Sequence, residues 1–222
     1  MDYRVEVEAP EAIAEPLRHG TDLVRWIGDA GMTREQLRRL ADDAVRDARS
    51  VAAAEGYFSA AARVEIDDQV QPWRVTLHVE PGERTHVAAV ELQVTGPAAA
   101  DLQAASRIAD LKKGWALRAG APFRQADWES AKREALKALS SWRYAAARVA
   151  SSEARVDAGT REARLSVVLD SGPAYRFGAT TVAGTQRYSP SLVESLSPVH
   201  PGDDYDRERL IVFQRRLIET GY

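Results

Sequence analysis

The stretch AAEGYFSAAARV, residues 53–64, joins a segment of helical periodicity to a segment of alternating periodicity. A second stretch, SSWRYAAARV at residues 140–149, has the same order and a similar composition. Buried side chains recur every three or four residues in a helix and every second residue in a strand. Each stretch therefore predicts a helix that ends just before a tyrosine and leads into a strand.

Other landmarks recur in the same order after roughly 90 residues, a length that fits small tandem domains rather than solenoid repeats. Gly96 of QVTG returns as Gly184 of TVAG. Gly82 of VEPGERT returns as Gly172 of LDSGPAY. The sequence therefore predicts three tandem modules, at residues 1–82, 83–172 and 173–222.

The middle module shows the repeating unit in full. Val90, Leu92 and Val94 alternate with polar residues, which is typical of a strand with one buried face. Leu102 is expected on the apolar side of the helix that follows. The order is β-α-α-β-β, with strands predicted at residues 87–95, 144–156 and 161–170 and helices at residues 98–111 and 128–142.

The first module repeats this order. Thr33 and Gln36 are spaced as a capping box, in which each side chain satisfies a free backbone N–H at the start of a helix. Gly56 is expected to end that helix in the left-handed conformation. The strands of this module are predicted at residues 3–8, 58–66 and 73–79, and its helical region begins at Glu11.

The third module lacks the second half of the unit. Its predicted strand, residues 176–183, alternates poorly, and Ser189 and Pro190 predict the start of a helix. A second helix ends at the Gly221-Tyr222 pair. Two helices need a sheet face against which to bury their apolar stripes. We therefore expect an α+β fold, with each three-stranded sheet covered on one face by two helices, and a chain that is the front portion of a longer protein.

Composition restricts the function classes. The 222 residues include 30 basic and 33 acidic side chains, so the net charge of −3 gives no electrostatic case for nucleic-acid binding. The absence of cysteine excludes thiolate metal sites and cysteine nucleophiles. The four histidines are scattered, and Gly202-Asp203-Asp204 is interpreted as the start of a helix rather than an acidic metal site. We expect neither enzyme activity nor a cofactor or metal.

Taken together, the tandem β-α-α-β-β units resemble POTRA domains, the polypeptide-transport-associated modules that precede the barrel in the BamA and TamA superfamily. The resemblance covers nearly the whole chain. Two departures are that Arg143 stands where the junction glycine is expected and that Ala62 stands where the second module has Val149. The TamA branch is favoured by the segments GYFSAAARV, WRVTLHVEPGERTHVAAVELQVTG, GAPFRQADWESAKREAL, LSVVLDSGPAYRFGATTVAGTQRY and PGDDYDRERL.

The resemblance implies a non-catalytic scaffold on the periplasmic face of the outer membrane of a Gram-negative bacterium. It implies a signal peptide and a C-terminal membrane β-barrel, both absent from this chain. The implied partners are unfolded outer-membrane or autotransporter polypeptides and a TamB-type protein that spans the periplasm. The alternative is the POTRA region of a two-partner-secretion pore with a single secreted client. A neighbouring gene for a long β-rich periplasmic protein favours assembly, and a neighbouring adhesin gene favours the pore.

Edge strands are the candidate binding sites. An edge presents unpaired N–H and C=O groups, and an extended client adds a strand there through backbone hydrogen bonds. In POTRA folds the second strand lies at the edge. The alternative for the alanines is that they simply fit beneath a helix. The candidates are Phe58, Ala60, Ala62, Val64 and Ile66 in the first module and Tyr144, Ala145, Ala146, Ala147 and Val149 in the second.

Two tryptophans are candidate partner anchors. Trp26 and Trp115 fall in irregular segments, where an exposed aromatic side chain is suited to holding a partner. The alternative is ordinary packing between modules. We expect an anchor to be exposed in the free chain.

Overall fold

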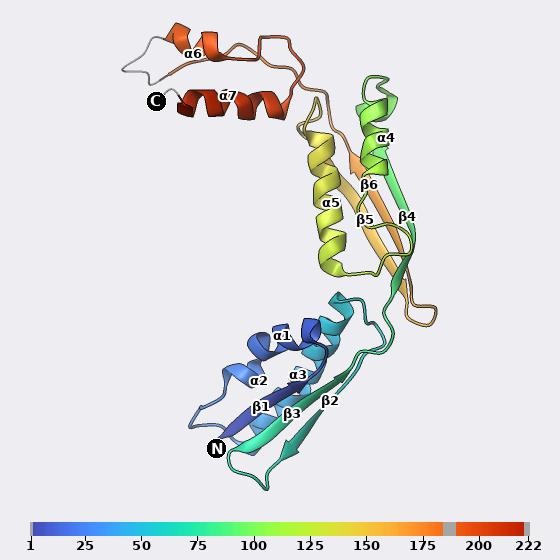
Figure 1. Ribbon diagram of the computed structural model, residues 1–222, viewed down its shortest axis with the longest axis vertical. Helices are drawn as coiled ribbons and strands as arrows, with labels where there is room; N and C mark the ends of the chain where they lie inside the picture. The colour runs from blue at the N-terminus through green and yellow to red at the C-terminus, as the bar shows by residue number, and fades with distance from the viewer. Residues whose placement is uncertain (1, 184–189, 220–222) are drawn as a thin grey trace. The chain divides into compact units, whose positions relative to one another are not determined.

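The structure is a computed structural model that describes residues 2–183 and 190–219. Its two three-stranded sheets and accompanying helices confirm the predicted α+β class (Figure 1). The strands are β1 (Tyr3–Glu8), β2 (Ala61–Asp67), β3 (Trp73–Glu80), β4 (His86–Thr95), β5 (Arg148–Asp157) and β6 (Glu162–Asp170). The helices are α1 (Glu11–Gly20), α2 (Asp22–Arg25), α3 (Arg34–Ala54), the 3₁₀ turn η1 (Pro97–Ala100), α4 (Ala105–Lys113), α5 (Gln125–Ser140), α6 (Pro190–Leu196) and α7 (Arg207–Glu219).

The chain forms two compact units. The first contains residues 1–90, 117–129 and 154–165, and the second contains residues 91–116, 130–153 and 166–222. The three tandem modules proposed from the repeat stay a prediction.

The first sheet has β3 in its centre. β1 runs parallel to β3 and β2 runs antiparallel to it, so β1 and β2 are the two edges. Val5 pairs with Val75, and Val64 pairs with Leu77, which places the apolar residues of all three strands on one face. This arrangement confirms the alternation predicted from the sequence.

Helices α1 and α3 pack against that apolar face. The capping box at the start of α3 is confirmed: the Gln36 N–H donates to Thr33 Oγ1 at 3.2 Å, and the Thr33 N–H donates to Gln36 Oε1 at 2.9 Å. The core of this sheet and its helices is built from fully buried side chains of both layers, among them Tyr3, Ile13, Leu17, Leu37, Val75 and Leu77.

The second sheet has the order β4-β6-β5, so β5 is an edge strand like β2. Every second residue of β6 is buried, from Ala163 to Leu169. Figure 1 shows α4 and α5 alongside these strands. The buried side chains of α5 are Trp128, Ala131, Ala135 and Leu139, within the helix predicted at residues 128–142. The helix ends at Ser140, so Trp142, which was predicted to continue this stripe, lies outside it.

The helix predicted at residues 98–111 is wrong in its first half. Helical structure consists of the short turn η1 and of α4, which begins only at Ala105. Asp101 between them has an extended backbone, and its carboxylate accepts the N–H of Gln103 at 2.9 Å. This turn interrupts the helix, and Leu102 is 91% exposed instead of lying on a buried side.

The strand predicted at residues 176–183 is also wrong. Among the described residues, this segment forms only an isolated bridge between Arg176 and Asp204. The predicted cap Ser189 lies outside the described residues, and α6 begins at Pro190 as expected. The predicted alternation was poor, and the structure shows that it is insufficient to specify a strand here.

The cap of α7 differs from the one predicted. Asp206 Oδ1 accepts the N–H groups of Glu208 at 2.9 Å and Arg209 at 3.3 Å, so Asp206 occupies the capping position. The Gly202-Asp203-Asp204 turn lies before it, where Asp203 accepts the N–H of His200 at 3.0 Å. Across residues 2–183 and 190–219, no helix combines the length and apolar character that a membrane span requires.

Candidate functional site

The first candidate edge, β2, is regular along its length. Its half-buried residues are Ala62, Val64 and Ile66, and the residues between them, Arg63 and Glu65, are exposed. Within the described residues, β2 is hydrogen-bonded to β3 on one side and to no other strand. Its other side therefore offers the backbone groups that an added strand requires.

Two predicted members of this edge lie before the strand. Phe58 and Ala60 belong to the turn that leads into β2, where the Ala60 N–H donates to the Tyr57 carbonyl at 3.4 Å. The ring of Phe58 packs near that of Phe123, with centroids 5.8 Å apart. Their predicted place in the strand is wrong because this turn delays the start of β2 to Ala61.

The second candidate edge, β5, begins later than predicted. Of the predicted residues, only Val149 lies in β5, while Tyr144, Ala145, Ala146 and Ala147 precede it. The Ala147 N–H donates to the Tyr144 carbonyl at 2.9 Å, which closes a turn. Tyr144 is only 2% exposed, so its side chain belongs to the core.

Each turn begins with a residue in the left-handed conformation. Gly56 has φ +94°, which confirms its predicted role at the end of α3. A Cβ at this position would lie 2.2 Å from the Phe123 carbonyl oxygen, so the close approach also requires glycine. Arg143, the residue that departs from the junction motif, has φ 58°. The two junctions therefore share a backbone conformation although their residues differ.

Charged side chains hold the first turn. Arg124 donates two hydrogen bonds to the Glu55 carboxylate, at 2.9 and 3.0 Å, and this contact raises the pKa of the Arg124 guanidinium. Arg84 donates to the Glu55 carbonyl at 3.0 Å, and its guanidinium lies 5.5 Å from the centre of the Tyr57 ring. Bidentate pairs of this kind fix geometry as well as charge. The turn before β2 is thus braced from residues far away in the sequence.

The second turn is held by the side chain of Arg143 itself. The guanidinium donates to Asp101 Oδ2 at 2.6 Å and to Gln103 Oε1 at 2.9 Å. It also lies 5.1 Å from the centre of the Trp142 ring and 3.5 Å from Asp204 Oδ1. These contacts stabilise a left-handed arginine, a conformation that costs about 1–2 kcal/mol in residues other than glycine.

Tyr144 and Asp101 form a hydrogen-bonded pair in the same cluster. The Tyr144 hydroxyl donates to Asp101 Oδ2 at 2.6 Å. Burial, followed by this contact with Asp101, raises the pKa of Tyr144 to about 12. The hydrogen bond from Tyr144 is the main cause that lowers the pKa of Asp101, with the nearby Arg143 charge contributing less.

Three main-chain hydrogen bonds form a closed ring beside this cluster. The Arg143 N–H donates to the Tyr205 carbonyl at 2.9 Å, the Tyr205 N–H donates to the Tyr175 carbonyl at 3.0 Å, and the Tyr175 N–H donates to the Arg143 carbonyl at 2.6 Å. The ring ties three segments that are distant in the sequence. Arg143 therefore positions the start of β5 through both its side chain and its backbone.

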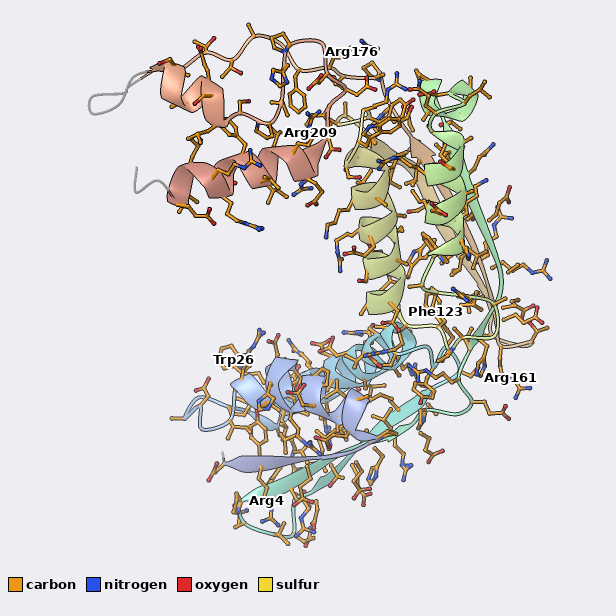
Figure 2. The ribbon with its side chains drawn as sticks, turned by 45° about the horizontal axis from the view of Figure 1, so that its top comes forward. Arg4, Trp26, Phe123, Arg161, Arg176 and Arg209 are labelled. Atoms are coloured by element: carbon orange, nitrogen blue, oxygen red, sulfur yellow. The ribbon has the colours of Figure 1, made fainter. Side chains whose placement is uncertain are left out.

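The two candidate anchors have different surroundings. Trp26 is 49% exposed at the end of α2, next to Ile27 at 43% (Figure 2). Trp115 is only 6% exposed, so its side chain is packed, as in the alternative to an anchor. It lines a cavity of about 390 Å³ between α4 and α5, together with Leu111 and Ala131. Trp26 thus meets the condition set for an anchor, and Trp115 does not.

Sequence reasoning missed the residues that brace the turns. Glu55 and Arg124, like Asp101 and Arg143, are far apart in the chain, and no local pattern marks them as partners. The left-handed arginine was marked only as a departure from the motif. Among the described residues, no group of His, Cys, Asp and Glu is arranged to hold a metal ion. The arrangement consists of strand edges preceded by braced turns.

No protein-family model matches the chain. Among solved structures, it is similar to POTRA domains 3–5 of BamA from Haemophilus influenzae, at 16% identity and a TM-score of 0.54, over 100% of this chain and 85% of that chain. Another match is the N-terminal domain of Omp85 from Thermosynechococcus elongatus, at 17% identity and a TM-score of 0.35, over 100% of this chain and 86% of that chain. The first likeness shows that the chain has the fold of POTRA domains.

Proposed function

We propose that the chain is the POTRA region of an Omp85-type outer-membrane protein assembly factor, which binds unfolded outer-membrane polypeptides as added strands. The observation that carries this is the regular free edge of β2 in a fold similar to that of BamA POTRA domains. Backbone hydrogen bonds at an edge depend little on the client's sequence. This suits clients whose sequences vary while their extended geometry does not.

The client-binding residues follow from the edges. Ala62, Val64 and Ile66 of β2 contact the added strand directly, and Val149 of β5 is the corresponding residue of the second candidate edge. The turn residues Phe58, Ala60 and Tyr144 to Ala147 hold the start of each edge in place. The braced turns support this division of roles, because they fix the strand that follows them.

We assign the chain further to the TamA branch, on the five sequence segments that resemble it. The client is then an autotransporter polypeptide, and the chain lies in the periplasm, anchored by a C-terminal barrel. A TamB-type protein docks on the loop after α2, where Trp26 and Ile27 are exposed. Exposed aromatic and aliphatic side chains of this kind often dominate the energy of an interface.

Site-specific photo-crosslinking tests the client-binding function. A photoreactive residue is placed at Arg63, exposed on β2, and in a matched variant at Arg38, exposed on α3. Each variant is mixed with a urea-unfolded outer-membrane barrel polypeptide after rapid dilution. We expect crosslinks from position 63 and few from position 38. Equal crosslinking from both positions contradicts binding at the edge.

Binding to the TamB-type protein is tested separately. Trp26→Ala is expected to weaken the affinity by tenfold or more, because it removes the largest exposed apolar side chain of the loop. The control is Leu102→Ala, which removes an apolar side chain that is 91% exposed elsewhere. An unchanged affinity for Trp26→Ala, or an equal loss in the control, contradicts the assigned anchor.

A further inference from the structure

We propose that the two candidate edges differ in what they accept: β2 takes an added client strand, whereas a β-bulge closes β5 to one. The inference rests on the strand addition proposed above. It specifies which edge carries that function and which client chemistry the edge prefers.

β2 has the geometry that a straight added strand needs. Its seven residues pair without interruption with β3, from Ala61 opposite Glu80 to Asp67 opposite Arg74. Half-buried and exposed residues alternate from Ala61 to Ile66 with no change of phase. A regular pleat presents its outward N–H and C=O groups at every second residue. An incoming strand therefore meets one continuous hydrogen-bonding register.

In β5, the alternation of half-buried and exposed residues shifts by one position along the strand. Val149 is half-buried, the next four residues are exposed, and Ala154 and Val156 are then half-buried. The half-buried positions thus move from odd to even numbers. The neighbouring β6 keeps one phase, with every second residue from Ala163 to Leu169 buried. One strand can change phase against a regular partner only if it contains an extra residue, which is a β-bulge.

A contact from α5 locates the extra residue. The Lys132 ammonium donates to Ser152 Oγ at 3.4 Å, so Ser152 lies on the helix-covered side of β5. Ser152 shares this side with Ala154 and Val156 and is already in their phase. The extra residue therefore lies at Ala150 or Ser151.

The bulge makes β5 a poor acceptor of an added strand. A bulge bends the strand and increases its twist, so the outward backbone groups on its two sides no longer form one register. Bulges are among the devices by which proteins prevent unwanted strand pairing at a sheet edge. β5 is thus protected, and β2 is the receptive edge.

The open face of β2 indicates the client's charge. Arg63 is paired with Glu80 of β3 at 3.5 Å. Glu65 and Asp67 place two carboxylates on the same face two residues apart, with Glu65 Oε2 at 3.6 Å from His78 Nε2. Opposite charges on directly opposed residues stabilise strand pairs, and like charges destabilise them. The preferred client therefore carries lysine or arginine at two positions separated by one residue.

The other face of the client must be apolar. Ala62, Val64 and Ile66 line the helix-covered side of β2, and an added strand extends this side. The preferred segment therefore alternates aliphatic residues with basic ones over about seven residues, the length of an ordinary strand.

A synthetic peptide of alternating valine and lysine tests this preference. Its binding is followed by amide resonances of the isotope-labelled chain. A peptide with the same composition but with valines and lysines in two blocks is the control. Broadening confined to residues 61–67, with the alternating peptide only, supports the proposal. Broadening at residues 148–157 overturns it and leaves strand addition standing, whereas no response at either edge removes the proposed function as well.

Two variants test the reasons given. The double variant Glu65→Lys with Asp67→Lys is expected to weaken the affinity for the alternating peptide by about tenfold or more. The attraction between the carboxylates and the peptide's lysines becomes a repulsion between like charges. The control, Asp42→Lys with Asp47→Lys, makes the same change of net charge at exposed positions of α3. Equal weakening in both variants overturns the assigned charge preference.

Deletion of Ser151 removes the extra residue from β5. Broadening by the peptide is then expected to appear at residues 148–157 of the variant. A folded deletion variant in which β5 still gives no response overturns the role of the bulge. The charge-reversal variant changes the exposed Glu65 and the half-buried Asp67 and deletes no residue, so the proposal stays testable whether or not the deletion variant folds.

Discussion

Replacing Arg143 by glycine separates the two effects that meet at the turn before β5. The change relieves a left-handed backbone and gains about 1–2 kcal/mol. It also removes the hydrogen bonds from the guanidinium to Asp101 and Gln103, of which the charged one contributes about 1.5–3 kcal/mol. The contact with the Trp142 ring contributes about 0.5–1 kcal/mol more. We therefore expect a net local loss of about 1.5 kcal/mol.

Hydrogen exchange of single amides measures this local loss. The Tyr175 and Tyr205 amides belong to the main-chain ring that includes Arg143. Their protection is expected to fall about tenfold in Arg143→Gly. The Leu77 amide of β3 is the internal control, and Arg143→Lys keeps the charge and the backbone conformation but loses the fork geometry. Higher protection of Tyr175 and Tyr205 in Arg143→Gly would refute the account of this turn.

Three other predictions concern the same turns and their pKa values. Gly56→Ala is expected to lower the free energy of unfolding in urea by more than about 2 kcal/mol, because its Cβ would lie 2.2 Å from the Phe123 carbonyl oxygen. The control is Gly28→Ala, where φ is +87° and no atom lies within 4 Å of the new Cβ, and it is expected to lose only about 1 kcal/mol of unfolding free energy. Equal losses in the two variants contradict the steric argument. A spectrophotometric titration is expected to show a phenol with a pKa of about 12, and this titration should disappear in Tyr144→Phe. The folded pKa of Tyr144 exceeds its ordinary value of 10.0. The stabilisation from the protonated phenol is therefore complete below pH 10.0 and is lost as the pH rises through about 12. The pKa of Asp101 lies below its ordinary value of 3.8, so the stabilisation from the ionised carboxylate is present above pH 3.8 and is lost as the pH falls through the folded pKa. Asp101→Asn should remove this contribution from the dependence of the unfolding free energy on acid pH. An acid profile that is unchanged in the variant contradicts the prediction.

The sheets could be predicted because their signals are local. The alternation of Val64 and Ile66 and that of Leu165 and Val167 specify strands with one buried face, and the structure has both strands. The Gly56 turn was also predictable, since a helix that ends at glycine has a known conformation. The start of each edge strand was not, because the turns before them are set by hydrogen bonds that the pattern does not encode.

The features that sequence reasoning missed depend on distant partners. Asp101 ends the helical path before α4 through its own turn and its contact with Tyr144, which lies in another element. The burial of Trp115 follows from the packing of α4 beside α5, which the irregular sequence around it does not specify. The phase change in β5 was hidden because Ser151 and Ser152 are both polar and fit either face. Tertiary contacts therefore decide the details from which the candidate site is built.

Hydrogen exchange of β2 in the presence of an unfolded outer-membrane polypeptide tests the central claim most directly. Strand addition forms new hydrogen bonds to the outward N–H groups of an edge. We predict that alternate amides within residues 61–67 gain protection on addition of the polypeptide, while the amides of β3 stay unchanged. Protection that appears only on α1 and α3, or no gain in residues 61–67 when the client is bound, would contradict the claim that this edge receives it.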